Sequence, residues 1–152
     1  MPIASYVPTK LKLAQVSGGG HAINFSGTLI CMLVTAGGGL PDTTNAGIQF
    51  VSDVLIGNPE VTGTGYSRQT LTSVTVAYDG SVNTQVDFSH AAITFAQNAA
   101  GFTNARYVIL YGSTGVDSTS PIFLVFDPNT TLSAQSGSVI LSSPVGGELQ
   151  WI

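Results

Sequence analysis

The sequence predicts a single all-β domain, a β-sandwich of the jelly-roll kind, preceded by an extended N-terminal arm. Short apolar segments rich in β-branched and aromatic residues recur along the chain. The chain contains 18 glycines and 7 prolines, which favour frequent turns between these segments. No long amphipathic helix and no regular repeat is visible, and 152 residues suit one domain. We assign residues 1–20 to the arm and residues 21–152 to the domain.

The arm is predicted from its first twenty residues. Pro2 and Pro8 oppose helix formation, and leucine alternates with lysine over residues 10–13, as in a half-buried strand. Three consecutive glycines at 18–20 form a flexible break. The segment either docks on a partner or joins the sheet as a strand, and both possibilities stay open at this point.

Apolar segments separated by turn residues predict the strands of the domain. The unbroken run at 29–34 suggests a strand buried on both faces. Asp79-Gly80 favours a hairpin, because both residues tolerate the positive φ of a type I′ turn. The predicted strands cover residues 23–35, 70–77, 82–88, 105–111, 121–126, 138–142 and 148–152, and Ile93 and Phe95 continue the apolar pattern beyond residue 88.

One short helix is predicted over residues 46–55. Ile48, Val51 and Leu55 are placed at helical spacing, and Gly57-Asn58-Pro59 would end the helix. A strand is the alternative for this segment.

The charge content is unusually low. Asp, Glu, Lys and Arg make up 8% of the residues, against roughly 25% in ordinary globular domains. Mean hydropathy is +0.34. A surface with so few charges is either covered by Ser, Thr, Asn and Gln or buried against other subunits, since interface centres are depleted in charge. We expect both, and therefore a homo-oligomer.

Several classes of partner are disfavoured. A net charge of −4 and an isoelectric point near 4.6 argue against nucleic acid as a partner. The longest apolar run is far shorter than the roughly 20 residues of a membrane-spanning helix, so no membrane is expected. Cys31 is the single cysteine and is predicted to be a buried, inert thiol.

No catalytic, metal-binding or cofactor-binding residues are predicted. Asp87, Ser89 and His90 are the closest grouping of triad residue types, but on a strand His90 would point away from the other two. Two histidines and one cysteine are too few for a convincing zinc site. Gly63-Thr64-Gly65 lacks the remaining residues of a phosphate loop and is interpreted as a tight turn.

A longer pattern is more informative. Asp53-Val54 precedes the segment 58–71, which has the form N-x-E-x-x-G-x-G-Y-x-R-x-x-L. This order resembles a group of small structural proteins of tailed bacteriophages. In that group a hairpin strand, an apolar segment with an aspartate, an A-R-Y-V strand and a final apolar strand pair follow. The corresponding segments here are 76–80, 87–96, 105–111 and 122–127, so the resemblance covers about residues 44–152.

The resemblance implies a virion component, most often a capsid decoration (cement) protein that binds the major capsid protein lattice, commonly as a trimer. It implies a β-sandwich and carries no catalytic residue. The first 40 residues depart from the pattern of the group. A tail, collar or head-fibre accessory protein is the alternative, and a carbohydrate-binding β-sandwich for host attachment is the second. The carbohydrate reading has weak support, because Trp151 is the single tryptophan.

Candidate partner-binding residues come from the arm and from the motif. The arm could offer apolar burial and two lysines to an acidic neighbour. Within the motif, Tyr66 either packs in the core or anchors an interface, and Tyr and Arg are enriched at interface hot spots. The candidates are Tyr6, Val7, Lys10, Leu11, Lys12, Leu13, Tyr66 and Arg68.

Overall fold

Strands dominate the computed structural model, which describes residues 3–5, 24–39, 41, 48–79, 85–143 and 149–151. These residues contain ten strands, one α-helix and one 3-10 turn, which confirms the all-β prediction. The strands are β1 (Ile3–Ser5), β2 (Leu29–Val34), β3 (Gln69–Thr70), β4 (Thr75–Asp79), β5 (Gln85–Ser89), β6 (Ile93–Phe95), β7 (Tyr107–Gly112), β8 (Ile122–Phe126), β9 (Val139–Leu141) and β10 (Leu149–Trp151). The helix is α2 (Val51–Gly57) and the 3-10 turn is η1 (Asp117–Thr119).

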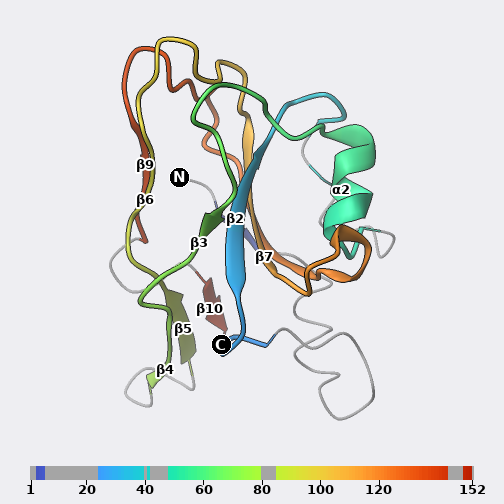
Figure 1. Ribbon diagram of the computed structural model, residues 1–152. Helices are drawn as coiled ribbons and strands as arrows, with labels where there is room; N and C mark the ends of the chain where they lie inside the picture. Colours follow the sequence, from blue (N-terminus) through green and yellow to red (C-terminus); the bar gives the residue numbers. More distant parts are fainter. Residues whose placement is uncertain are drawn as a thin grey trace.

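The centre of the fold is a five-stranded antiparallel sheet in the order β1-β8-β7-β2-β3. Strands β2 and β7 pair along their whole length, from Leu29 opposite Gly112 to Val34 opposite Tyr107. The register between β7 and β8 shifts after Leu110. This sheet runs through the middle of the molecule in Figure 1.

Both faces of the central sheet are buried, as the apolar runs predict. Along β2, Cys31 and Leu33 face one apolar cluster, whereas Met32 and Val34 face the other. Every residue of β7 and of β8 is buried. Cys31 is buried, as predicted. A strand with both faces covered needs apolar residues at consecutive positions, which is the pattern of these segments.

Different elements cover the two faces (Figure 1). Helix α2 lies on one face and buries Val51 and Val54 in its apolar cluster. The two-stranded sheet β6-β9 lies on the other face, where Ile93, Phe95 and Val139 join the second cluster together with Phe88 of β5.

The predicted helix is confirmed, but it covers Val51–Gly57 instead of residues 46–55. The reason is tertiary pairing. Gln49 O accepts a hydrogen bond from Ile122 N at 3.1 Å, and Phe50 forms a β-bridge with Pro121. These contacts hold residues 49 and 50 extended beside the start of β8, so helical backbone starts only afterwards. Residues 42–47 lie outside the described residues.

The predicted hairpin is confirmed, but two of its details are wrong. Asp79 pairs with Gln85 and therefore belongs to β4 instead of to a turn, while Gly80 and the rest of the connection to residue 84 lie outside the described residues. The predicted strand at 70–77 is divided into β3 and β4, which belong to different sheets. Ser73, between them, has a φ of 50°, which extended backbone does not allow. Strand β10 pairs with the other edge of β5.

Part of the predicted arm belongs to the central sheet. Ile3–Ser5 forms β1, which pairs antiparallel with the outer edge of β8. The remaining residues of the segment 1–20 lie outside the described residues. No helix among the described residues is long and apolar enough to cross a lipid bilayer.

Candidate functional site

Arg68 is the centre of the most connected polar cluster among the described residues. It directly precedes β3, and its guanidinium lies between two carboxylates. Toward Glu60, Arg68 Nη2 donates to Oε2 at 2.7 Å and Nε donates to Oε1 at 3.0 Å. Toward Asp117, Nη1 donates to Oδ1 at 2.6 Å and Nη2 donates to Oδ2 at 2.9 Å. Both contacts are bidentate, the strongest geometry of an arginine–carboxylate pair.

Two tyrosines complete this group, which we call the Arg68 cluster (Glu60, Tyr66, Arg68, Tyr111 and Asp117). The Tyr111 hydroxyl accepts a hydrogen bond from Arg68 Nη1 at 3.0 Å. The Tyr66 hydroxyl donates to Glu60 Oε1 at 2.8 Å. The cluster therefore connects β7, η1 and the segment between α2 and β3.

Tyr66 also completes the edge of β2. Its hydroxyl accepts a hydrogen bond from Leu33 N at 3.0 Å, beyond the point where β3 stops pairing with β2. Its ring stacks on Phe95 at 5.8 Å between centroids and meets Phe102 edge to face. Of the two possibilities left open by the sequence, core packing therefore describes the observed contacts of this ring.

The electrostatics of the cluster follow from burial and pairing. Burial raises the pKa of the Tyr66 hydroxyl far above its ordinary value, and the neighbouring Glu60 carboxylate adds to the shift. The pKa of Tyr111 is also raised, mainly by burial. Hydrogen bonds from Arg68 lower the pKa of Asp117 below its ordinary value. Bonds to Asp117 and Glu60 raise the pKa of Arg68 further, so its charge is fixed.

The backbone that carries Glu60 and Tyr66 is held by tight local contacts. Glu60 forms a β-bridge with Val34 at the end of β2. At Gly63 an added Cβ would lie 2.5 Å from the backbone nitrogen of Phe102, so only glycine fits there. Gly65 has a φ of 79°, a conformation that glycine adopts without strain. The interpretation of this glycine segment as a tight turn is confirmed by the hydrogen bond from Tyr66 N to Gly63 O at 3.1 Å.

Asn58, at the start of the same motif, has a comparable structural role. It is buried, and its side-chain amide donates to Thr35 O at 3.0 Å and to Gly39 O at 2.8 Å. It thereby ties the end of α2 to the loop after β2. The motif 58–71 thus consists largely of residues that fix the backbone.

A second arginine is paired in the same manner. Arg106 Nη1 lies 2.8 Å from Asp127 Oδ1, and its Nη2 donates to Oδ2 at 3.1 Å. The guanidinium also lies over the ring of Tyr107, 5.4 Å from its centroid. This pair joins the start of β7 to the end of β8.

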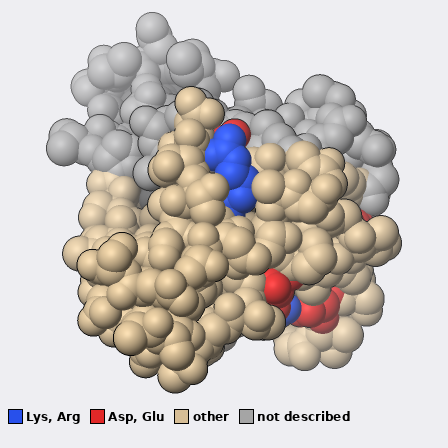
Figure 2. Space-filling model, turned by 90° about the horizontal axis from the view of Figure 1, so that it is seen from above, with Lys and Arg blue, Asp and Glu red and all other residues tan. Residues whose placement is uncertain are grey.

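The charged residues whose side-chain contacts the structure describes are all engaged within the chain, whereas the side chains of Asp79 and Asp87 lie outside the described ones. Besides the two arginines and their three acidic partners, Asp53 accepts hydrogen bonds from Gln49 N and Phe50 N at 2.8 Å each and caps α2. Figure 2 shows one face of the molecule, on which charged residues occupy a few small areas and the other described residues are uncharged. Exposed apolar side chains accompany this neutral surface, with Ile56 86%, Ile140 60% and Val116 58% exposed.

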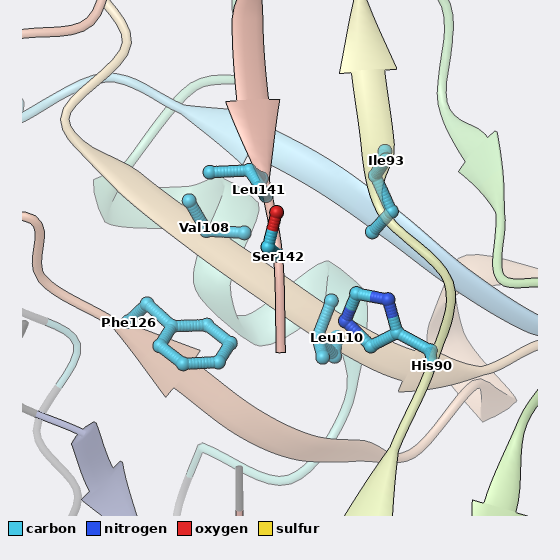
Figure 3. A pocket seen from close by; sticks show the side chains of 7 residues that line it. All are labelled: His90, Ile93, Val108, Leu110, Phe126, Leu141 and Ser142. Carbon is cyan, nitrogen blue, oxygen red and sulfur yellow. The ribbon is translucent and has the colours of Figure 1, made fainter. Parts of the chain in front are cut away.

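Two cavities lined by described residues are small. The one in Figure 3 lies between the β6-β9 sheet and the central sheet, and has a volume of about 20 Å³, room for about one water molecule. Its lining is mostly apolar and consists of His90, Ile93, Val108, Leu110, Phe126, Leu141 and Ser142. A second hollow, of about 190 Å³, is bounded by uncharged residues of the segments 24–28 and 112–121. Both are smaller than the roughly 300–1,000 Å³ of small-molecule sites.

Of the residue types of a triad at 87–90, Ser89 and His90 make other contacts, and the side chain of Asp87 lies outside the described ones. Ser89 Oγ is hydrogen-bonded to Thr75 Oγ1 at 2.6 Å, and His90 Nδ1 to Ala91 O at 2.6 Å. Ser143 Oγ accepts a bond from His90 N at 2.9 Å and donates to His90 O at 3.1 Å. These bonds attach the end of β9 to the link between β5 and β6. Among the described residues there is no group of three or more potential metal-binding side chains.

The structure brings together two of the eight candidate partner-binding residues, Tyr66 and Arg68, and adds three residues that the sequence did not single out. Glu60 belongs to the same motif and could have been found there. Asp117 lies 49 residues from Arg68 and has no local signal. The arm candidates Tyr6, Val7, Lys10, Leu11, Lys12 and Leu13 lie outside the described residues, and their role stays a prediction.

Comparisons of this chain with protein-family models, with curated proteins and with solved structures find no match.

Proposed function

We propose that this chain is a non-enzymatic virion structural protein, a capsid decoration (cement) protein that binds and stabilises the lattice of the major capsid protein. One observation carries the proposal. The charged side chains whose contacts the structure describes are engaged within the chain, and apolar residues such as Ile56 and Ile140 are exposed on the surface. The centres of protein–protein interfaces have this composition.

The roles of the motif residues support the resemblance to small phage structural proteins. Asn58, Glu60, Gly63, Tyr66 and Arg68 fix the backbone between α2 and β3. Proteins that share this backbone conformation need the same residues to fix it, even when their surfaces bind different partners. The motif is therefore suited to be the signature of a shared fold.

The finer fold class is part of the proposal. We assign the domain to the β-sandwiches of the jelly-roll kind. The assignment is supported by the β6-β9 sheet and Phe88 of β5, which pack on one face of the central sheet. Helix α2 covers the opposite face, which gives this sandwich a helical outer layer.

The proposed partners are the major capsid protein and further copies of this chain in a homotrimer, on the surface of a capsid assembled in the host cytoplasm. The arm residues Tyr6 to Leu13 supply apolar side chains and two lysines for this contact. Tyr66 and Arg68 act indirectly in this proposal, because their hydrogen bonds hold the loops that a partner would meet.

Counting copies in purified particles tests the location. Quantitative mass spectrometry would measure this chain against the major capsid protein of the same particles. We expect hundreds of copies per particle. A handful would instead identify a tail, collar or head-fibre accessory protein, and absence from the particles would contradict a virion role.

A binding experiment tests the surface. Purified wild-type protein and the variants Ile56→Asp and Ile140→Asp would be added to undecorated capsids, and occupancy measured after sedimentation of the capsids. We expect lower occupancy for at least one variant, because a new charge at an interface centre must lose its hydration. Thr103→Asp is the matched control, since it adds the same charge at an exposed position without removing an apolar side chain. Equal occupancy for all proteins would contradict the role of these residues.

A further inference from the structure

The outer edge of β8 is covered by a very short strand. On its inner edge β8 pairs with β7, and on its outer edge three residues pair with β1, namely Ile3 with Phe126, Ala4 with Val125 and Ser5 with Leu124. All five residues of β8 are buried. An uncovered edge on so apolar a strand would present unpaired backbone groups to any neighbouring chain.

The connection from β1 to the rest of the sheet is long. Residues 6–28 separate β1 from β2. A fully extended segment of this length spans at most about 75 Å. A domain of this size has a radius of gyration of roughly 15 Å. The connection is therefore long enough to bring Ile3–Ser5 to the β8 edge of its own domain or of an adjacent copy.

We propose that the outer edge of β8 is a strand-acceptor site, and that in the oligomer it is filled by Ile3–Ser5 of a second copy of this chain. The pairing is the one described within the chain, with the same register and the same backbone hydrogen bonds. Exchange of an identical element between copies is a low-cost route to an oligomer, because it needs no new contact surface.

Two further observations favour a second copy as the occupant. Charged residues make up only 8% of the chain and the net charge is −4, so the electrostatic repulsion between two approaching copies is small. The entropic cost of closing a connection grows with its length, and residues 6–28 form a long connection between β1 and β2. This cost lets a neighbouring copy compete with the chain's own β1 for the edge of β8. The inference goes beyond the virion role and does not depend on it.

Disulfide formation between different chains tests the exchange. Two single variants, Ala4→Cys and Val125→Cys, would be unfolded together, refolded together and oxidised. Directly opposed residues of antiparallel strands have Cα atoms about 4.5–5.5 Å apart, which suits a disulfide. We expect a covalent dimer that contains one chain of each variant, identified by mass spectrometry. In the double variant Ala4→Cys/Val125→Cys, we expect disulfides that join different chains.

The controls separate exchange from random oxidation and from misfolding. Ala4→Cys mixed with Thr72→Cys, an exposed position outside the proposed pair, should give no more dimer than the wild type with its buried Cys31. If far-UV circular dichroism shows that Val125→Cys is unfolded, Ser5→Cys and Leu124→Cys test the same register. Links formed only within single chains, with no mixed dimer above the control, would overturn the proposal. Because the test uses purified protein without capsids, this outcome would leave the decoration role standing.

Discussion

Arg68 and Asp117 lie 49 residues apart in the chain and form two parallel hydrogen bonds, of 2.6 and 2.9 Å. The pair ties the 3-10 turn η1 to the segment before β3. Glu60 holds the opposite side of the same guanidinium. The loops on this side of the molecule are therefore positioned by one positive charge between two negative ones.

Removing the arginine should destabilise the fold. Arg68→Gln leaves Glu60 and Asp117 near each other without a cation, and we expect the free energy of unfolding to fall by roughly 1–3 kcal/mol, since the group is partly exposed. Arg106→Gln is the matched comparison, because Arg106 has one acidic partner instead of two. We expect it to cost less. Urea unfolding followed by circular dichroism measures both, and equal costs would contradict the importance of the double pairing.

Acid should weaken the same pair. The pKa of Asp117 lies below its ordinary value of 3.8 because Arg68 donates hydrogen bonds to its charged form. A lowered pKa stabilises the folded state at pH values above the ordinary value, and this contribution is lost as the pH falls through the lowered value. The stability difference between the wild type and Asp117→Asn should therefore be constant near neutral pH and shrink below about pH 4. Urea unfolding across this range is the measurement, and a constant difference down to the most acidic condition would contradict the prediction.

The hydroxyl of Tyr66 should contribute to stability separately from its ring. Tyr66→Phe keeps the stacking on Phe95 but leaves Leu33 N without its acceptor, so we expect a loss of roughly 1–3 kcal/mol. Arg68 Nη1 donates to both Tyr111 and Asp117, so Tyr111→Phe removes only one of two acceptors of this group. It should therefore cost less. Chemical denaturation of the two variants tests this order. A greater loss for Tyr111→Phe would contradict it.

The same tyrosines should resist ionisation in alkali. Their raised pKa values stabilise the folded state below the ordinary value of 10.0, and this contribution is lost as the pH rises above it. Of the five tyrosines, at least Tyr66 and Tyr111 should therefore ionise late in a titration followed by ultraviolet absorbance. Tyr66→Phe should remove part of the late phase only. Ionisation of all five tyrosines in one early step, with the fold intact, would contradict this expectation.

Gly63 should not tolerate a side chain. In Gly63→Ala the added Cβ would meet the backbone of Phe102, and we expect a loss of at least about 2 kcal/mol. Gly137→Ala is the matched control, because nothing lies within 4 Å of its added Cβ and its φ is not positive. It should be neutral or slightly stabilising. Thermal unfolding of both variants compares them, and similar midpoints would contradict the packing at Gly63.

The sequence by itself determined the strand character and most strand positions. Segments 29–34, 105–111 and 121–126 are apolar at nearly all positions, which is typical of strands with both faces covered, and the structure places β2, β7 and β8 there. It also located the hairpin, the helix and the tight turn at Gly63. These features depend on local backbone preferences, which neighbouring residues reveal.

Tertiary structure alone decided three matters. Helix α2 starts at Val51 because residues 49 and 50 pair with the start of β8, more than 70 residues further along the chain. The Arg68 cluster needs Asp117, whose closeness to Arg68 follows from the order of strands in the sheet. Ile3–Ser5 pairs with β8, which lies more than 100 residues further along the chain. Each is a contact between distant residues, and such contacts depend on which strands become neighbours, which local composition does not encode.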